Sequence, residues 1–200
     1  MGRRALSKNR KPLTKKVKAW LADLLLKLQS EDLEQLTMDD IAFLAKKSKS
    51  TIYVYFDSKE EILLAASKTR LEGSTKTIAH VLTEDLDTLQ LYRSLVHIFI
   101  EATVGISISY LQSIKKNYPV IWQVIEETTD YFLHLLSKQY KKGMEEGIFN
   151  EVSVELASHL DKIFVMQVVT NPDFFNDDSY TTSDLIKDYL NLRLTGLLKR

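Results

Sequence analysis

The sequence of 200 residues predicts an all-α protein, and three observations lead to that prediction. Only 6 Gly and 3 Pro occur, which is too few for the many tight turns of an all-β fold. Apolar residues recur three and four positions apart along most of the chain, as they do in amphipathic helices. With 44% apolar residues the chain can also bury a sizeable core. We therefore expect a small N-terminal helical domain followed by a larger helical body.

The charges balance over the whole chain but are distributed unevenly along it. Residues 1–56 hold 12 basic and 6 acidic residues, whereas residues 57–200 hold 15 basic and 21 acidic residues. All eight charges in residues 1–20 are positive. This asymmetry indicates a polyanionic partner for the N-terminal part alone, the alternative being a solvated tail. We expect residues 1–12 to form a basic flexible tail.

Composition and motifs disfavour several classes of protein. The chain has no Cys, which excludes disulfides, thiolate metal sites and Cys nucleophiles. No two of its four His are four residues apart, and HExxH, GxSxG and P-loop motifs do not occur. We therefore expect no enzyme, no metal and no cofactor. The longest uncharged run, residues 102–114, is too short to cross a bilayer, and no apolar segment follows the basic N-terminus, so we expect a cytoplasmic protein without membrane contact.

The first helix is predicted from residue 13 to about residue 29. Its apolar residues form one stripe, with spacings of three and four: Leu13, Val17, Trp20, Leu21, Leu24, Leu25 and Leu28. Thr37 can cap a second helix and Ser48 a third. Ser58 and Glu61 form a capping-box pattern that predicts the start of a fourth helix. Because such short helices are marginal alone, we expect them to pack on one another and on the stripe of the first helix.

The remainder of the chain predicts longer helices. We expect them at residues 59–81, 86–104, 106–116, 120–142, 152–169 and 183–199. Gly143 and Gly147 are suited to left-handed caps where the helix at 120–142 ends. The sequence Asn171-Pro172-Asp173 begins a loop that is expected to reach about residue 182.

Residues 37–61, TMDDIAFLAKKSKSTIYVYFDSKEE, carry the functional information. Two short helices joined by three or four residues predict a helix-turn-helix, whose second helix enters the major groove of DNA. Ile52 and Phe56 are one turn apart and would face inward. The residues that would face outward carry hydroxyl, ammonium and phenol groups: Lys49, Ser50, Thr51, Tyr53 and Tyr55. For the two tyrosines the alternative is packing within a small core.

This segment resembles the DNA-binding region of the TetR family of bacterial transcriptional regulators. The matching residues are Ile41-Ala42, Ser48-Lys49-Ser50-Thr51-Ile52-Tyr53-Val54-Tyr55-Phe56 and Lys59-Glu60-Glu61-Ile62-Leu63. The resemblance implies a helix-turn-helix DNA-binding domain at 13–58 and an effector-binding and dimerisation domain at 59–200. It also implies base contacts from Lys49 and Ser50, and phosphate contacts from Thr37, Tyr53, Tyr55 and Lys59. The complete set of expected DNA-binding residues is Thr37, Lys47, Ser48, Lys49, Ser50, Thr51, Tyr53, Tyr55 and Lys59.

The turn of the motif departs from the family pattern. The family usually has Gly-Val there, and this chain has Lys46-Lys47. Glycine serves at such a position because it adopts positive φ without strain. Two alternatives follow: either Lys46 accepts the left-handed conformation, or the turn has another geometry. A further alternative is that the two lysines are there to add phosphate contacts.

The C-terminal body is expected to form a homodimer and to bind an effector, as the resemblance implies. The last two helices have broad apolar faces, and the expected interface residues are Leu156, Leu160, Ile163, Phe164, Leu185, Tyr189 and Leu192. The alternative is that these faces pack only within one protomer. A pocket for a small hydrophobic or aromatic effector is expected among the aromatic and soft side chains of the middle helices: Tyr92, Phe99, Tyr110, Trp122, Tyr131, His134 and Met166. Each of these is individually also consistent with plain core.

The leading hypothesis is a homodimeric repressor of transcription that a small effector releases from a palindromic operator in double-stranded DNA. Three alternatives stand beside it, two of them from other classes of protein. A ligand carrier with a vestigial motif would dimerise without preferring any DNA sequence. An enzyme would place a cluster of titratable groups in a pocket. A regulator that only dimerises would have a body without a cavity.

Overall fold

The computed structural model describes residues 10–171 and 180–199, and every named element within these ranges is a helix. This confirms the expected all-α fold. Most of the predicted basic tail, and the loop predicted after residue 171 up to residue 179, lie outside the described residues.

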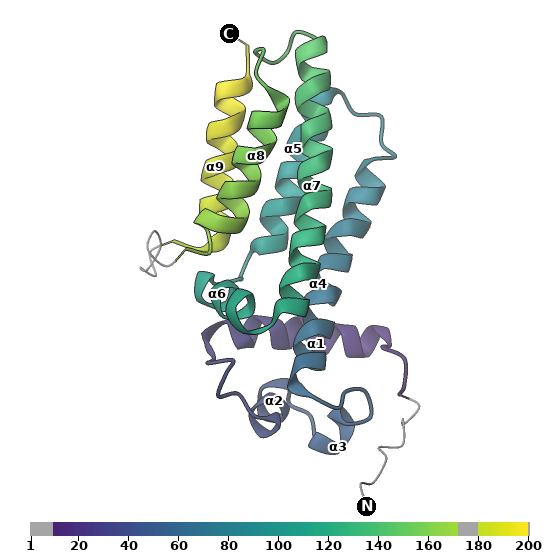
Figure 1. Ribbon diagram of the computed structural model, residues 1–200. Helices are drawn as coiled ribbons and strands as arrows, with labels where there is room; N and C mark the ends of the chain where they lie inside the picture. Colours follow the sequence, from purple (N-terminus) through teal and green to yellow (C-terminus); the bar gives the residue numbers. More distant parts are fainter. Residues whose placement is uncertain (1–9, 172–179, 200) are drawn as a thin grey trace, which may run out of the picture.

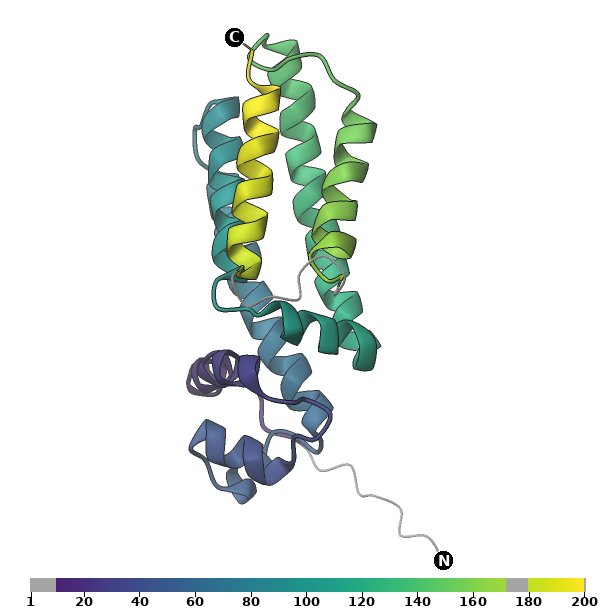
Figure 2. The same cartoon turned by 90° about the vertical axis from the view of Figure 1, so that its left-hand side faces the viewer.

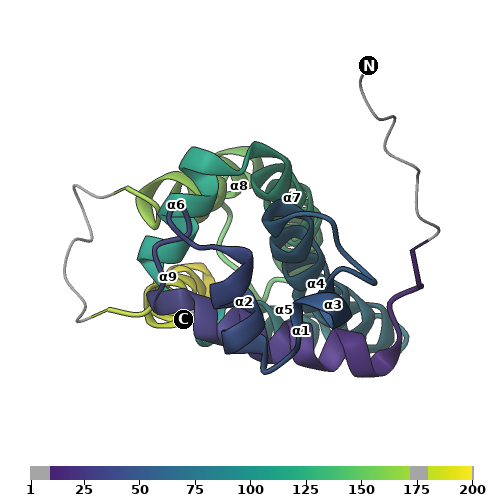
Figure 3. The same cartoon turned by 90° about the horizontal axis from the view of Figure 1, so that it is seen from below.

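The N-terminal part forms one end of the molecule, seen end-on in Figure 3. Helix α1 (Lys15–Lys27) continues into a single 3₁₀ turn, η1 (Leu28–Ser30). Helices α2 (Met38–Ala45) and α3 (Lys49–Ile52) follow as the two short helices of the motif. The long helix α4 (Lys59–Val81) then leads from this end into the body (Figure 1).

The body is a bundle of helices arranged mostly along its long axis (Figure 1). It contains α5 (Thr88–Thr103), α7 (Pro119–Glu145), α8 (Val154–Ile163) and α9 (Thr182–Leu197). Helix α6 (Ile108–Asn117) crosses the bundle axis between the body and α1. Helix α8 continues into a π-helical segment, η2 (Phe164–Val168), a local winding that frequently occurs at functional sites.

Two serines predicted to cap helices do so in the structure, whereas the last helix, predicted to begin at residue 183, is capped by Thr181. Ser48 and Ser58 accept hydrogen bonds from the amides of Thr51 and Glu61, respectively. The capping box predicted at Ser58 is only half formed, because the Glu61 carboxylate accepts from the Asp57 amide at 2.9 Å instead of from the Ser58 amide.

The two glycines near the end of α7 have different roles. Gly147 adopts φ +72°, as expected for a left-handed position after a helix. Gly143 was expected in a similar cap, but it lies inside α7, which continues to Glu145. A Cβ atom at Gly143 would lie 2.2 Å from the nearest ring carbon of Phe149, so this glycine allows a close approach of the phenyl ring.

Two hydrophobic cores stabilise the molecule. The first contains the predicted stripe of α1 together with Ile41, Ile52 and Phe56, and it also takes in Tyr110 of α6. The second lies at the far end of the bundle, among α5, α7 and α9. Because α4 and α6 contribute to the first core, packing continues across residue 58, the boundary predicted between the domains.

Within the described residues, no single helix is long and apolar enough to span a bilayer. The one combination that reaches this length and apolarity is the pair α5 and α6, which is bent by 79°.

Candidate DNA-binding surface and ligand cavity

Helix α3 is anchored by its apolar side. Ile52 is fully buried, and Phe56 packs edge-on against Trp20 of α1 with ring centroids 6.0 Å apart. At its start the Ser48 hydroxyl accepts from the Thr51 amide at 3.2 Å and lies 2.8 Å from the Thr51 hydroxyl. The helix is therefore fixed on the domain by two apolar contacts and one cap, and its opposite side is free for a partner.

The opposite side of α3 exposes polar groups. The exposed residues are Ser48, Lys49, Ser50, Thr51 and Tyr53, while Lys47 and Tyr55 are half-buried. The Tyr55 ring lies against Phe56 with centroids 6.2 Å apart, so it combines packing with partial exposure. This is the orientation expected for a surface that meets DNA, and the contacts of each residue with DNA stay predictions.

Lys49 has an intramolecular partner on the exposed surface. Its Nζ lies 2.8 Å from one carboxylate oxygen of Asp39 in α2 and 3.0 Å from the other. The hydrogen bond to this carboxylate, together with its charge, raises the pKa of Lys49. A phosphate or a base acceptor must therefore compete with Asp39 for the ammonium group.

Two residues expected at phosphates, Thr37 and Lys59, have partners within the domain. Thr37 caps α2: its hydroxyl accepts from the Asp40 amide at 3.3 Å and donates to the Asp40 carboxylate. The hydrogen bonds from Thr37 lower the pKa of Asp40. The Lys59 ammonium donates to the carbonyl oxygens of Leu33 at 2.8 Å and Glu34 at 3.1 Å. Lys59 thus joins the start of α4 to the segment after η1, a role that the sequence did not indicate.

The turn between α2 and α3 has the geometry of the family pattern without its glycine. Lys46 adopts φ 52° and ψ 46°, and it is the only non-glycine residue with positive φ in the described ranges. The Lys46 amide donates to Phe43 O and the Lys47 amide to Ala42 O, both at 3.0 Å, which is the pattern of a Schellman motif. Of the two alternatives, Lys46 therefore accepts the left-handed conformation.

The basic residues before α1 are only partly covered by the structure. The Arg10 guanidinium pairs with the carboxylates of Asp57 and Glu61, which raise its pKa. Lys18 pairs with Glu72 at 2.5 Å. These pairs hold the start of the described chain beside α4. The cations at positions 3, 4 and 8 lie outside the described residues.

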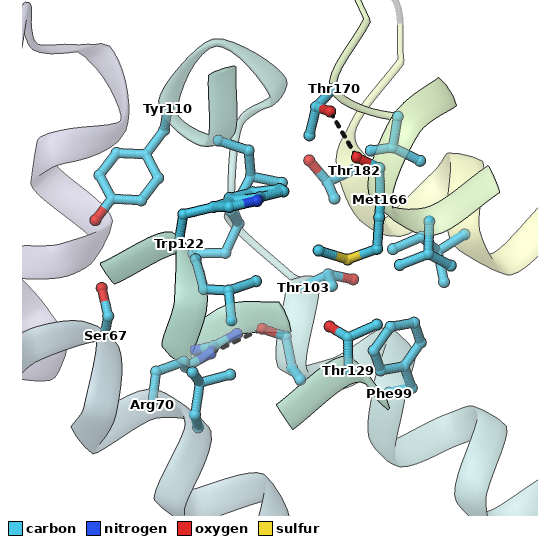
Figure 4. A pocket seen from close by; sticks show the side chains of 18 of the residues that line it. Ser67, Arg70, Phe99, Thr103, Tyr110, Trp122, Thr129, Met166, Thr170 and Thr182 are labelled. Atoms are coloured by element: carbon cyan, nitrogen blue, oxygen red, sulfur yellow. Dashed lines mark hydrogen bonds between the residues drawn. The ribbon is translucent and has the colours of Figure 1, made fainter. Parts of the chain in front are cut away.

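The body contains a cavity of about 90 Å³ next to α6 (Figure 4). Its wall comes from α4, α5, α6, α7, η2 and α9, together with Leu25 of α1. Most of the lining side chains are aliphatic or aromatic, and the polar ones are hydroxyls and Arg70. Among the described residues, no Asp or Glu lines it. Four of the seven expected pocket residues do: Phe99, Tyr110, Trp122 and Met166.

The other three expected pocket residues lie elsewhere, which corrects the expectation. Tyr92 is buried in the second core, where its ring packs against Tyr140 with centroids 6.0 Å apart. Tyr131 and His134 are exposed on α7. The neighbouring Phe132 faces the second core, so its position on the helix turns Tyr131 and His134 outward.

Two cations beside the cavity, which the sequence analysis did not single out, are bound to neutral oxygens. Arg70 donates to the carbonyl oxygens of Glu101, Ala102 and Val104 at the end of α5. Lys115 of α6 donates to Met166 O at 3.1 Å and to the Thr170 hydroxyl at 2.8 Å. One signal in the sequence could have pointed to Arg70. It lies three residues after Ser67, which also lines the cavity, and residues three apart share a helix face.

Helix α6 connects the cavity to the DNA-binding end. At its start the Ser107 amide donates to the Gln29 side-chain oxygen at 2.8 Å, and the Ser107 hydroxyl donates to Gln29 O at 2.9 Å. Just after its end, the Tyr118 hydroxyl donates to Leu33 O at 2.8 Å. Tyr110 lines the cavity and belongs to the first core. A displacement of α6 would therefore be transmitted to α1 and to the segment before α2.

Helices α8 and α9 both lie on the side of the body that faces the viewer in Figure 2, and side-chain contacts join them. Four of the expected interface residues are exposed large hydrophobics: Leu156, Leu160, Ile163 and Leu192. Two more, Phe164 and Tyr189, are half-buried and stack on each other with centroids 4.0 Å apart. Leu185 is buried within the protomer, which corrects its assignment to an interface.

A buried ionic network fixes α7, α8 and α9 relative to one another. Asp161 is 1% exposed and accepts hydrogen bonds from the Tyr140 hydroxyl at 2.6 Å, the Tyr189 hydroxyl at 2.7 Å and Arg193 Nε at 3.0 Å. Burial, together with this carboxylate, raises the pKa of both phenols. The network lies beneath the exposed α8–α9 face and stabilises it. No sequence motif predicted this network.

Comparison with known proteins finds a family model that matches the segment containing α2 and α3. Residues 28–66 match the family model described as bacterial regulatory proteins, tetR family. No curated protein sequence matches the chain. The solved TetR-family regulator PfmR of Thermus thermophilus is 25% identical, with 90% of this chain and 99% of that chain covered and a TM-score of 0.63.

Two further solved structures share the fold. The fatty acid degradation regulator FadR of Bacillus halodurans is 23% identical over 95% of this chain and 100% of that chain, with a TM-score of 0.66. The regulator FadR of Bacillus subtilis, in complex with stearoyl-CoA, is 20% identical over 89% of this chain and 98% of that chain, with a TM-score of 0.62.

Proposed function

The chain is a TetR-family transcriptional regulator, and on this premise we propose that it is a homodimeric repressor that a small apolar effector releases from a palindromic operator. The observation that carries the DNA-binding part is the geometry of α3. Two buried apolar residues hold this helix on the domain, while Lys49, Ser50 and Thr51 face solvent. A helix so presented fits the major groove, where ammonium and hydroxyl groups meet base edges.

The α8–α9 face supports the homodimer. Leu192 is 72% exposed and Leu156 is 60% exposed, and they belong to neighbouring helices. Clusters of exposed apolar side chains mark interaction sites, and pairing this face with its copy about a two-fold axis would bury it. A two-fold dimer carries two copies of α3, and these match the two half-sites of a palindromic operator.

The cavity supports an effector. It is mostly apolar, as small-molecule sites usually are, and α6 joins its wall to the DNA-binding end. FadR from Bacillus subtilis, which shares this fold, forms a complex with stearoyl-CoA, and this supports a ligand with an apolar part. The cavity therefore favours an effector-controlled repressor over a regulator whose body only dimerises.

The DNA-binding part is tested by two variants of α3 and a charge-matched control. Lys49→Ala removes the exposed cation of α3, and Tyr55→Phe removes one hydroxyl from the same surface. Lys142→Ala also removes an exposed lysine, but at the far end of α7. Operator fragments selected from random DNA provide the ligand for mobility-shift titrations.

We expect Lys49→Ala to weaken operator binding by about 1–3 kcal/mol and to relax the preference for one base pair. Tyr55→Phe should weaken binding to all sequences, and Lys142→Ala should leave it unchanged. Affinity should fall steeply with salt because phosphate contacts release counterions. Equal operator affinity in Lys49→Ala, Tyr55→Phe and the unmodified protein would remove α3 as the DNA-binding helix.

A further inference from the structure

The cavity wall contains a buried hydroxyl that forms no hydrogen bond of normal geometry, with the Ser67 hydroxyl nearby. Tyr110 is 4% exposed, and its hydroxyl oxygen makes no hydrogen bond to any described residue. In Figure 4 this hydroxyl points toward that of Ser67, which is also buried. Buried hydroxyls are nearly always hydrogen-bonded, so an unpaired one that lines a cavity marks a position for a ligand atom. Burial raises the pKa of Tyr110 to about 12, against the opposing effect of the nearby Ser67 hydroxyl, so at neutral pH the group is a donor.

The charges around this corner favour an electron-rich atom. Arg70 lies on the same helix as Ser67, one turn further along, and is bound only to carbonyl oxygens. Lys115, beside the opposite wall, is also bound to neutral oxygens, and neither cation forms an ion pair with a described residue. Two cations therefore lie near the cavity, and no acidic side chain is in its described lining. A ligand cation would be repelled, and an anion or a carbonyl oxygen would be attracted.

The rest of the wall is apolar and extends away from the Tyr110 corner. Trp122, Met166 and Phe99 lie successively further from Tyr110 in Figure 4, and each lines the cavity. An extended apolar group that starts at the corner would therefore contact aromatic and soft side chains along its length. A second unpaired hydroxyl, that of Thr182, lies beyond Trp122 and outside the corner.

We propose that the cavity recognises an apolar compound by a single acceptor oxygen, of a carboxylate or a carbonyl group, to which the Tyr110 hydroxyl donates in the corner shared with Ser67 and Arg70. This inference rests on the proposed function in one respect, namely that the cavity is an effector site. It specifies the chemistry of the effector: an extended apolar body, an oxygen acceptor at one end, and no positive charge. Because Tyr110 is part of α6, the bond attaches the ligand to the helix that contacts α1.

The experiment compares three ten-carbon probes that differ only at one end: decanoate, methyl decanoate and decylamine. Trp122 lines the cavity and reports binding by its fluorescence, and Trp20→Phe removes the only other tryptophan. Binding is measured on the dimer without DNA. We expect decanoate and methyl decanoate to bind and decylamine to bind at least about tenfold more weakly. Tighter binding of decanoate than of the ester would identify a carboxylate as the preferred acceptor, and equal binding a neutral carbonyl.

Two matched variants then test the hydroxyl. Tyr110→Phe removes only the proposed donor, and folding should be unaffected because this hydroxyl forms no hydrogen bond of normal geometry in the protein. Tyr92→Phe also removes a buried, unpartnered hydroxyl, but one that lies in the second core. We expect decanoate affinity to fall about tenfold in Tyr110→Phe and to stay unchanged in Tyr92→Phe.

Each result is decisive for the inference. Unchanged affinity of Tyr110→Phe for the probe that binds, equal binding of decylamine, or no binding of either decanoate or methyl decanoate would each overturn it. Its failure is distinguishable from a failure of the proposed function, because ligand binding and operator binding are measured separately. If decanoate binds through Tyr110 but does not displace the operator, the ligand chemistry stands and effector control fails. If the operator is bound and no probe binds, DNA recognition stands and the ligand chemistry fails.

Discussion

Lys46→Gly should make this protein more stable, although it removes a side chain and adds none. Lys46 is in the left-handed region, with φ 52° and ψ 46°. For a residue with a Cβ atom this conformation costs roughly 1–2 kcal/mol, and glycine adopts it freely. Glycine also gains about 0.5–1 kcal/mol of conformational freedom in the unfolded chain, which offsets part of the relief. The net gain in the free energy of unfolding should be about 0.5–1 kcal/mol.

Urea denaturation followed by circular dichroism measures this difference, and a thermal melt should show a rise of roughly 1–4 °C for a chain of this size. Lys47→Gly is the control, because it removes the same charge from the same turn at a residue without positive φ. Lys47→Gly should lower the free energy of unfolding, since glycine makes the unfolded chain more flexible and no backbone strain at residue 47 is relieved. If Lys46→Gly is no more stable than the unmodified protein while Lys47→Gly behaves as expected, the strain argued from the turn is absent.

Three more predictions follow from packing and burial. Gly143→Ala should lower the free energy of unfolding by roughly 1–3 kcal/mol, measured by urea denaturation, because its Cβ would meet the Phe149 ring. The control Gly73→Ala, whose Cβ would have nothing within 4 Å, should raise it by up to about 1 kcal/mol. Equal changes in the two variants would contradict the packing argument. Leu160→Asp should convert the dimer to a folded monomer in sedimentation velocity, and a persistent dimer would exclude the α8–α9 face. Because burial raises the pKa of Tyr110 to about 12, the stability it contributes is complete below pH 10 and is lost as pH rises from 10 to 12. Tyr110→Phe should lose less stability than the unmodified protein over that interval in alkaline denaturation.

Helix starts were predictable from the sequence because they depend on neighbours in the chain. Ser48 and Ser58 each cap the helix that follows, since a hydroxyl reaches an amide three residues ahead whatever the rest of the protein does. The strain at Lys46 was one of two alternatives, and it was recognisable only because the family that the segment resembles usually has glycine there. The exposed side of α3 followed from the positions of its two apolar anchors, Ile52 and Phe56.

The features that the sequence did not reveal depend on distant contacts. Gly143 has the residue type of a helix end, and only the position of Phe149 explains why it lies inside α7. His134 has the chemistry of a pocket residue, but α7 turns it to solvent. Lys59 resembles a phosphate ligand, and its ammonium is bound to carbonyl oxygens more than 20 residues away in sequence. The residue type determines which interactions a side chain can form, and the packing of the helices determines which partner is within reach.

The small size of the cavity bears on how effector and operator compete. About 90 Å³ corresponds to roughly three water molecules in the liquid, whereas ligand pockets are usually on the order of 300 Å³ or larger. A ten-carbon ligand must therefore stabilise a form of the body that is wider than this one. Helix α6 forms one wall and is hydrogen-bonded to Gln29 in η1, so widening there displaces the DNA-binding end.

A ligand that prefers the wider form shifts the population by its difference in affinity for the two forms. Such coupling is reciprocal for binding free energies. If effector binding weakens operator binding by a given factor, operator binding must weaken effector binding by the same factor. Decanoate titrations of the free dimer and of the operator complex should therefore differ by the ratio of the operator affinities measured with and without decanoate. If the ratio of decanoate affinities differs from the ratio of operator affinities, decanoate weakens operator binding from a site other than the cavity that Trp122 reports.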